Sequence, residues 1–254
     1  DFEAQILPNT KVIYVESPSN PLMKIIDLKA IAVLAKSKGL ISMIDNTFAS
    51  PINQNPIAFG IDIVIHSATK YLSGHSDICA GAIASSKEHI DTIWRLAKDL
   101  GGSLSDFTVW MLERSMKTLG IRVRAQQENA LKLARYLESN PDVDSVYYPG
   151  LKSHPEHKLA KSQMSGFGAM MSFELSHDLD ALLFQKELKL IKSSMSLAGI
   201  ESTMLSPYLT SHALLTQEER DNVGISDQLI RFSVGIEEAK DLKRDISQAI
   251  AALK

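Results

Sequence analysis

Four short apolar runs in the first third of the chain predict strands. Each run is nearly continuously apolar or small, as is typical of a parallel sheet covered on both faces. The predicted strands are residues 11–16, 40–45, 62–67 and 78–85. This third of the chain is therefore predicted to form an α/β unit that contains a parallel sheet.

One helix is predicted between the first two strands, over residues 28–38. Asp27 provides an N-cap, and Gly39 stands just past the last turn. The resulting strand–helix–strand unit should cross over in the right-handed sense.

From residue 104 onward, helices alternate with short strands. Helices are predicted over residues 104–119, 122–139 and 237–253, and strands over 145–148, 169–175 and 229–234. We place a domain boundary near residue 121, with an α/β domain over 1–121 and a smaller α+β domain over 122–254. Because no Gly/Pro-rich linker marks this boundary, continuous helix should join the two parts.

Polar residues collect where the first three strands end. They occupy residues 16–20 (ESPSN), 45–47 (DNT) and 66–70 (HSATK). In an open parallel sheet, ligands bind outside the carboxyl ends of the strands, so these three clusters should converge on one place. Each cluster taken singly is equally well explained as a turn or a helix cap.

Lys70 is the first candidate for chemistry. A lysine at a strand end, with Ser67 and Thr69 beside it, fits a Schiff-base lysine whose pKa is lowered by its surroundings. The two hydroxyls are suited to donate hydrogen bonds to a phosphate. The alternative for a lone lysine is a solvated surface position.

Asp45 ends an apolar strand, where a carboxylate is costly unless it is paired. A protonated pyridine nitrogen would be a fitting partner, because the ion pair keeps such a ring able to accept electrons. A cap of the following turn is the alternative.

Arg231 lies in residues 228–235 (QLIRFSVG), where apolar and polar positions alternate. An arginine in so apolar a strand suits bidentate binding of a substrate carboxylate, and a surface salt bridge explains it equally well. Residues 193–202 (SSMSLAGIES) form a hydroxyl-rich turn with the same ambiguity.

Composition removes several classes of function. The 254 residues are 44% hydrophobic and 22% charged, with a net charge of −3, so neither nucleic acid nor a membrane surface is an expected partner. The single cysteine, Cys79, excludes an internal disulfide and is expected to fill the core. No apolar run approaches the roughly 18 residues of a membrane span, and the cytoplasm is the expected location. The histidines show no metal-ligand spacing, so no metal is expected.

The same residues carry a resemblance to a known family. The segments VESPSNP, IDNTFASP, DIVIHSATKYLSGHSD, YPGLKSHPEH, SLAGIES and ISDQLIRFSVGIE resemble landmarks of the Cys/Met-metabolism family of enzymes that depend on pyridoxal 5′-phosphate (PLP). The SATKY…GHSD segment is the most specific of them. The resemblance runs from about Lys11 to the C-terminus.

This resemblance implies a role for each candidate residue. Lys70 resembles the lysine that forms the Schiff base with PLP and serves as catalytic base, and Asp45 the partner of the pyridine nitrogen. Ser67 and Thr69 match the phosphate-binding hydroxyls. The remaining implied positions are Asn20 near the phenolic oxygen, Glu16 as its supporting carboxylate, Thr47 against the ring, and Ser196 and Arg231 on the substrate carboxylate.

The resemblance also implies an architecture. The expected fold is the C-terminal part of an aspartate-aminotransferase-like (fold type I) PLP domain, followed by a smaller α+β domain, assembled as a homotetramer built of two dimers. Family members have a long stretch before the strand at Lys11, so the chain is expected to be an N-terminally truncated fragment that is inactive alone.

The implied function is trans-sulfuration by γ-replacement or C–S elimination, of the cystathionine γ-synthase or cystathionine lyase type. Methionine γ-lyase and O-acylhomoserine sulfhydrylase are alternatives. A catalytically inactive PLP-fold protein and a transaminase are alternatives of other classes. Two positions depart from the family pattern: Ala198 replaces a more usual glycine, and Met195 stands where several γ-synthases and γ-lyases have glutamate. Met195 favours a substrate with a smaller or less polar distal end.

Overall fold

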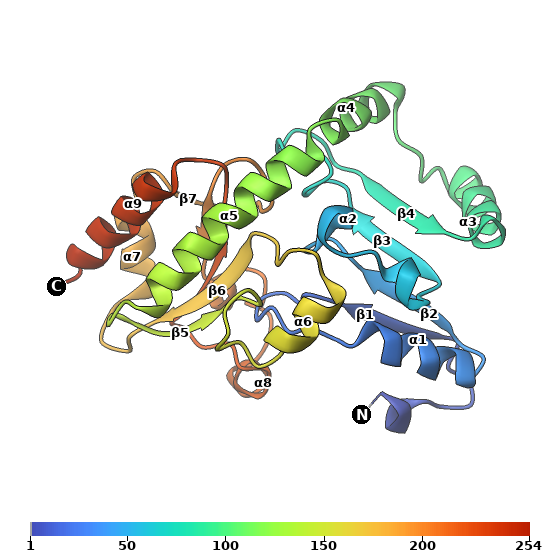
Figure 1. Ribbon diagram of the computed structural model, residues 1–254, viewed down its shortest axis with the longest axis horizontal. Helices are drawn as coiled ribbons and strands as arrows, with labels where there is room; N and C mark the ends of the chain where they lie inside the picture. Colours follow the sequence, from blue (N-terminus) through green and yellow to red (C-terminus); the bar gives the residue numbers. More distant parts are fainter. Residues whose placement is uncertain (1) are drawn as a thin grey trace.

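The computed structural model describes residues 2–254 and contains two sheets joined by a long helix (Figure 1). The first sheet has the order β1-β2-β3-β4, with β1 (Val12–Glu16), β2 (Ile41–Asp45), β3 (Ile63–Ser67) and β4 (Gly81–Ser85). The second has the order β5-β6-β9-β8-β7, with β5 (Val143–Tyr147), β6 (Met170–Leu175), β7 (Lys192–Ser193), β8 (Thr203–Leu205) and β9 (Leu229–Ser233).

The other regular elements are helices. The α-helices are α1 (Leu28–Ser37), α2 (Ser50–Asn53), α3 (Lys87–Leu100), α4 (Asp106–Met116), α5 (Leu119–Glu138), α6 (His157–Gln163), α7 (Ala181–Glu187), α8 (Gln217–Val223) and α9 (Ala239–Ala251). Three 3-10 helices are η1 (Glu3–Gln5), η2 (Pro56–Phe59) and η3 (Pro207–Leu209). As predicted, Asp27 caps α1, accepting a 2.9 Å hydrogen bond from the Ala30 amide.

Strands β1, β2 and β3 are parallel, as predicted, whereas the expectation that the fourth strand is parallel is wrong. β4 pairs antiparallel with β3. A parallel return needs a crossover, usually a helix, and residues 68–80 contain none because they form the turn around Lys70. The expectation of cover on both faces is also wrong for this chain: Tyr14 on β1 is 54% exposed and Ile83 on β4 is 43% exposed.

Helix α5 spans the predicted boundary at residue 121 and lies across the second sheet (Figure 1). Its buried apolar residues recur at helical spacing and pack into the larger hydrophobic core with β6, β9 and α9. These residues are Leu119, Val123, Ala130, Leu133, Ala134 and Leu137. A smaller core lies between α1 and strands β1 to β3. The helix that was expected to join the two parts therefore also supplies one wall of the core.

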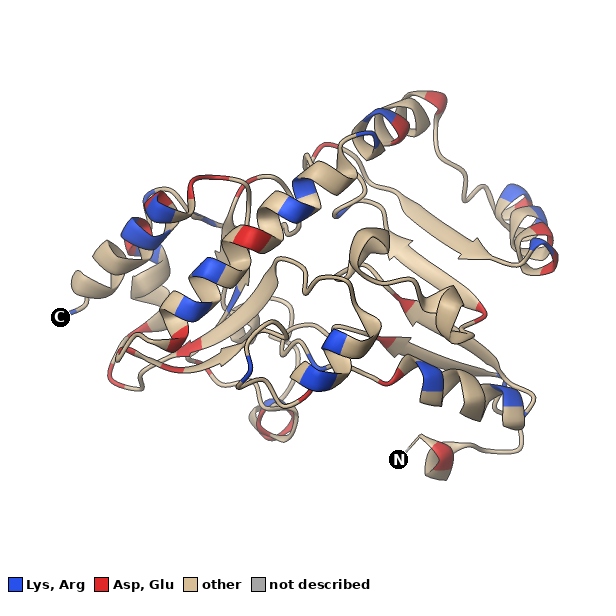
Figure 2. Cartoon of the chain, viewed as in Figure 1, with Lys and Arg blue, Asp and Glu red and all other residues tan. Residues whose placement is uncertain are grey.

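Acidic and basic residues are interspersed along α3, α5 and α9 (Figure 2). This mixture of signs is in keeping with the small net charge of −3. Within residues 2–254, none of the helices combines the length and the apolar character that a membrane crossing requires.

The packing of α5 leads to a first prediction. Leu133 is 1% exposed in the core, so Leu133→Ala should lower the free energy of unfolding by about 2–5 kcal/mol through lost burial and the cavity left behind. Urea denaturation followed by circular dichroism measures this change. Leu214 is fully exposed, so Leu214→Ala is the matched control and should change stability by less than about 0.5 kcal/mol. Equal effects of the two substitutions would contradict the assigned core.

Candidate active site

The carboxyl ends of β1, β2 and β3 meet, as the sequence predicted. Glu16 and Asp45 are register partners in the parallel pair β1–β2. Asp45 Oδ1 accepts a 2.9 Å hydrogen bond from the Thr47 amide, and Thr47 Oγ1 accepts a 2.8 Å bond from the Ser67 amide. Side-chain bonds thus join the ends of β2 and β3, and strand pairing places the end of β1 beside them.

Lys70 lies in the tight turn that follows β3. Its amide donates to the Ser67 carbonyl at 3.1 Å, and its carbonyl accepts from the Gly74 amide at 2.7 Å. The side chain is half-buried, and burial lowers the pKa of the Lys70 amine, with the nearby charge of Arg231 adding to the effect. Within residues 2–254, no carboxylate lies within ion-pair distance of Nζ. The alternative of a fully solvated surface lysine is wrong.

The two hydroxyls beside Lys70 differ in their surroundings. Thr69 Oγ1 accepts from the Ala80 amide at 2.9 Å and donates to the Ala80 carbonyl at 3.3 Å, which ties the turn to the start of β4. The Ser67 hydroxyl takes no part in these contacts. Of the two, Ser67 has the less committed hydroxyl.

Arg231 comes from the second sheet and is 4% exposed. Its guanidinium donates to Asn20 Oδ1 at 3.4 Å and to the Met195 carbonyl at 3.1 Å. Burial lowers its pKa to about 10, and in the described part of the chain no carboxylate forms an ion pair with it. The surface salt bridge that the sequence left open is therefore wrong, and the site holds a buried cation beside a loop of the first sheet.

The loop before β8 carries Met195 and Ser196. Met195 is 64% exposed, and Ser196 Oγ lies 3.3 Å from Ser76 Oγ in the loop that follows Lys70. Ala198 has φ +62°, in the left-handed region where a side chain is strained. This gives a physical reason for the glycine that the family more often has there.

Glu16 and Asp45 bring two carboxylates together at adjacent strand ends. Burial, followed by the charge of Asp45, raises the pKa of Glu16 to about 7, and a hydrogen bond from the Asn20 amide opposes this rise. The Glu16 carboxyl thus keeps a proton over much of the acidic range, which lowers the repulsion between the two groups.

Several residues at this site were missed by the sequence analysis. Arg122 and Gln126 on α5 are 6% and 0% exposed and bond to loops on both sides of the site. In Ser76, Oγ donates to Glu201 Oε1 at 2.7 Å. The sequence does contain a signal for Arg122 and Gln126. Both lie on the apolar stripe of α5, where a buried polar residue needs a hydrogen-bond partner.

One expectation about packing is wrong. Cys79 was expected in the core and is exposed, in the segment between the Lys70 turn and β4. In residues 2–254, no group of three or more His, Cys, Asp and Glu side chains is arranged to hold a metal ion.

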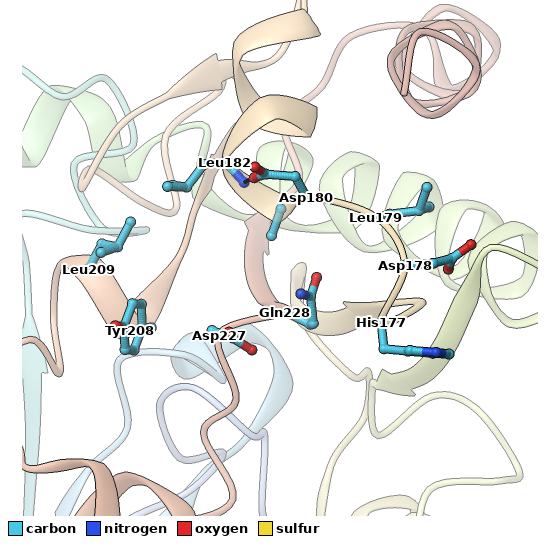
Figure 3. A pocket seen from close by; sticks show the side chains of 10 residues that line it. His177, Asp178, Leu179, Asp180, Leu182, Tyr208, Leu209, Asp227 and Gln228 are labelled. Carbon is cyan, nitrogen blue, oxygen red and sulfur yellow. Dashed lines mark hydrogen bonds between the residues drawn. The ribbon is translucent and has the colours of Figure 1, made fainter. Parts of the chain in front are cut away.

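A hollow of about 400 Å³ lies elsewhere, beside the start of α7 (Figure 3). His177, Asp178, Asp180, Tyr208 and Asp227 are among the residues that line it. None of the predicted site residues is among them. Asp180 is committed to capping α7 through bonds to the Leu182 and Leu183 amides, so we assign this hollow no part in the chemistry.

Known proteins match almost the whole chain. The family model described as Cys/Met metabolism PLP-dependent enzyme matches residues 1–251. A cystathionine β-lyase of Lactococcus lactis subsp. cremoris (strain MG1363) is 46% identical over 251 residues, covering 98% of this chain and 66% of that protein. A cystathionine γ-lyase of Bacillus subtilis (strain 168) has the same identity, 46%, and the same coverages, 98% and 66%.

A solved structure of a similar protein also matches the chain. Cystathionine γ-lyase from Lactobacillus plantarum, complexed with L-serine, superposes with a TM-score of 0.96 at 43% identity, covering 99% of this chain and 66% of that one. The chain thus spans slightly less than two thirds of the length of these relatives. The family, the α/β fold class and the cofactor PLP predicted from the motifs are confirmed. The chain belongs to the Cys/Met metabolism family of PLP-dependent enzymes.

Proposed function

We propose that the protein is a PLP-dependent enzyme that catalyses C–S bond elimination or γ-replacement on a sulfur-containing amino acid. The observation that carries this proposal is a pair of basic side chains, Lys70 just after the parallel strand β3 and Arg231 on β9 of the second sheet, with no carboxylate paired to either within residues 2–254. A ligand that brings both a carbonyl and negative charge suits these groups.

The donors and acceptors at the site fit PLP. Lys70 Nζ would hold the cofactor covalently, because a lowered pKa leaves more of the amine neutral and nucleophilic. Asp45 has one carboxylate oxygen bonded to the Thr47 amide and would pair with a protonated ring nitrogen through the other. Ser67 and Thr69 would donate to the phosphate, and Thr47 and Asn20 would lie against the ring and its phenolic oxygen.

PLP, when bound, supplies an electron-accepting ring that stabilises negative charge at the substrate Cα. Arg231 and Ser196 bind the α-carboxylate, and Asn20 holds the guanidinium in place through its 3.4 Å bond. Lys70 Nζ accepts the proton from Cα and returns protons to the product. Its neutral form is the one that acts as a base, and burial together with the charge of Arg231 favours that form.

Met195 bears on the choice of substrate. Its side chain is apolar and 64% exposed, while its carbonyl bonds to Arg231, so it stands beside the place where the α-carboxylate binds. A substrate with a small or weakly polar distal end is therefore favoured.

Relatives at equal identity, 46%, carry the names of a β-lyase and a γ-lyase, so product analysis must separate the reactions. Cystathionine, methionine, and O-acylhomoserine with cysteine, offered in turn, are distinguished by the masses of their products.

We extend the proposal to a homotetramer built of two dimers. Large apolar side chains on α3 and α4 are exposed in the single chain, as expected of surfaces that become covered on assembly. They include Trp94 at 62%, Phe107 at 67% and Trp110 at 57% exposed. Light scattering of the purified protein measures the assembly.

The direct test of this function is Lys70→Ala. Full-length protein purified with PLP should show a visible absorbance band that borohydride bleaches, and the substitution should abolish the band and lower turnover by at least about 10³-fold. Lys161, exposed on α6, provides the matched control Lys161→Ala, which should leave both unchanged. A bleachable band of normal intensity in Lys70→Ala would overturn the assignment of Lys70.

Arg231 generates a second test. Arg231→Lys keeps a positive charge but loses the planar fork, so KM for the amino-acid substrate should rise about 10- to 100-fold. A substrate analogue that lacks the α-carboxylate should react equally slowly with parent and variant. Arg244→Lys, at an exposed position on α9, is the control. An unchanged KM would show that the carboxylate binds elsewhere.

The raised pKa of Glu16 predicts that the stability of the cofactor-free protein depends on pH. Its pKa is about 7 in the folded chain against an ordinary value of 4.5, so between these values the folded chain keeps a proton that the unfolded chain has lost. The free energy of unfolding should therefore fall as pH rises from about 4.5 to 7. Glu16→Gln should remove this fall and gain about 1 kcal/mol relative to the parent at pH 8, a small value because solvent screens a half-buried group.

Urea titrations at pH 5, 6, 7 and 8 measure this difference. Glu218→Gln on α8, at an exposed position, serves as the control. A constant difference between Glu16→Gln and the parent at all four pH values would contradict the raised pKa.

A further inference from the structure

The turn that presents Lys70 is held from α5 by Arg122. Its Nη1 donates to the Tyr71 carbonyl at 2.9 Å and its Nη2 to the Leu72 carbonyl at 3.3 Å, the two residues directly after Lys70. The same guanidinium reaches the junction between α4 and α5, through Nη2 to the Ser115 carbonyl at 3.0 Å and Nε to Thr118 Oγ1 at 3.2 Å. Four bonds thus fix one side chain between the turn and the helix.

Arg122 makes no ion pair in the described chain, although it is only 6% exposed. Its buried charge is balanced by three carbonyl dipoles and one hydroxyl, so the carbonyls of the turn cannot move away without leaving part of the guanidinium unsatisfied. Gly74 shows how closely the turn wraps around it. A Cβ on Gly74 would meet Arg122 Nη1, and the φ of +71° at this residue also disfavours a side chain.

One helical turn further along α5, Gln126 holds the other half of the site. Its Nε2 donates to the Gly199 carbonyl at 2.7 Å and to the Val234 carbonyl at 3.2 Å. Gly199 follows Ser196 in its loop, and Val234 follows the strand of Arg231. Because positions four apart lie on the same helix face, one face of α5 contacts both the Lys70 turn and the loops that carry the carboxylate-binding groups.

A direct bond between the loops closes this arrangement. The Gly74 carbonyl accepts from the Ile200 amide at 2.9 Å, and Ser76 bonds to Glu201. The turn and the carboxylate loop are therefore fixed to each other as well as to α5. A displacement of Arg122 or Gln126 would therefore strain the bonds between the Lys70 turn and the carboxylate loop.

We propose that Arg122 and Gln126 are positioning residues, Arg122 setting the place of Lys70 Nζ and Gln126 the place of the carboxylate-binding loop. The inference rests on the proposed function of Lys70. Neither residue touches the reacting atoms; each acts through the backbone of a loop that does. A shift of about 1 Å in a reacting group costs on the order of 100-fold in rate, so the two substitutions have different kinetic signatures.

The experiment compares Arg122→Met and Gln126→Met with Arg124→Met, an exposed arginine on the same helix. Arg122→Met should lower kcat about 10- to 100-fold and change KM by less than about 3-fold. Gln126→Met should mainly raise KM, by about 10-fold, because the carboxylate loop moves. Arg122→Lys should recover part of kcat by bonding to one of the carbonyls, and Arg124→Met should match the parent.

Two further readouts are independent of turnover. The pH midpoint of the lysine-bound PLP band should move by at least about 0.5 unit in Arg122→Met, because the surroundings of Lys70 change. Hydrogen exchange over residues 70–76 of cofactor-free protein should become faster in Arg122→Met and stay unchanged in Arg124→Met.

The outcomes separate this inference from the proposed function. A full-length parent protein with no bleachable band and no turnover refutes the proposed function itself. An active parent, combined with an Arg122→Met protein of normal kcat and normal pH midpoint, overturns the positioning role alone. Should Arg122→Met not fold, Thr118→Val removes the acceptor of Nε, together with the bond from Thr118 Oγ1 to the Ser115 carbonyl, and should lower kcat about 2- to 5-fold with a shift of midpoint in the same direction. An unchanged kcat and midpoint in Thr118→Val would then count against the proposal.

Discussion

Uncompensated positive charge is the constraint around which this site is organised. Arg231 is 4% exposed and bonds only to the neutral oxygens of Asn20 and Met195, while Lys70 stands nearby with a lowered pKa. A buried cation is costly without a counter-charge, so the site is electrostatically prepared for anionic groups. A phosphate and an α-carboxylate are two such groups, and a PLP enzyme acting on amino acids brings both.

The two carboxylates at the strand ends do not cancel this charge. Asp45 is bonded to the backbone of its own turn, and the neighbouring Glu16 has a pKa raised to about 7. Near neutral pH, part of the Glu16 population is therefore uncharged, which lowers its repulsion with Asp45, the proposed partner of the ring nitrogen. The two kinds of charge come from different sheets: Glu16 and Asp45 end strands of the first sheet, and Arg231 lies on β9 of the second.

The sequence was sufficient to predict the residues fixed by local geometry. Glu16, Asp45 and Ser67 follow apolar runs, and parallel strands place such ends side by side. The antiparallel direction of β4 was not predictable in this way, because it depends on how residues 68–80 fold around Arg122. The contacts of Arg122 to Tyr71 and of Gln126 to Gly199 join residues 51 and 73 positions apart. Periodicity along one helix identifies a polar residue on an apolar stripe without naming its partner.

The proposed catalytic residues and Met195 are held in different ways. The groups that any reaction of this family would share, Lys70 and Asp45, stand at the ends of strands and are fixed by backbone hydrogen bonds on several sides. Met195 is tied to Arg231 only through its carbonyl, and its side chain is 64% exposed. With Arg231 binding the substrate carboxylate as proposed, a substitution at Met195 changes what the distal end of a substrate meets and leaves the carboxylate contact intact. On this proposal, substrate choice varies at Met195 while the chemistry at Lys70 stays constant.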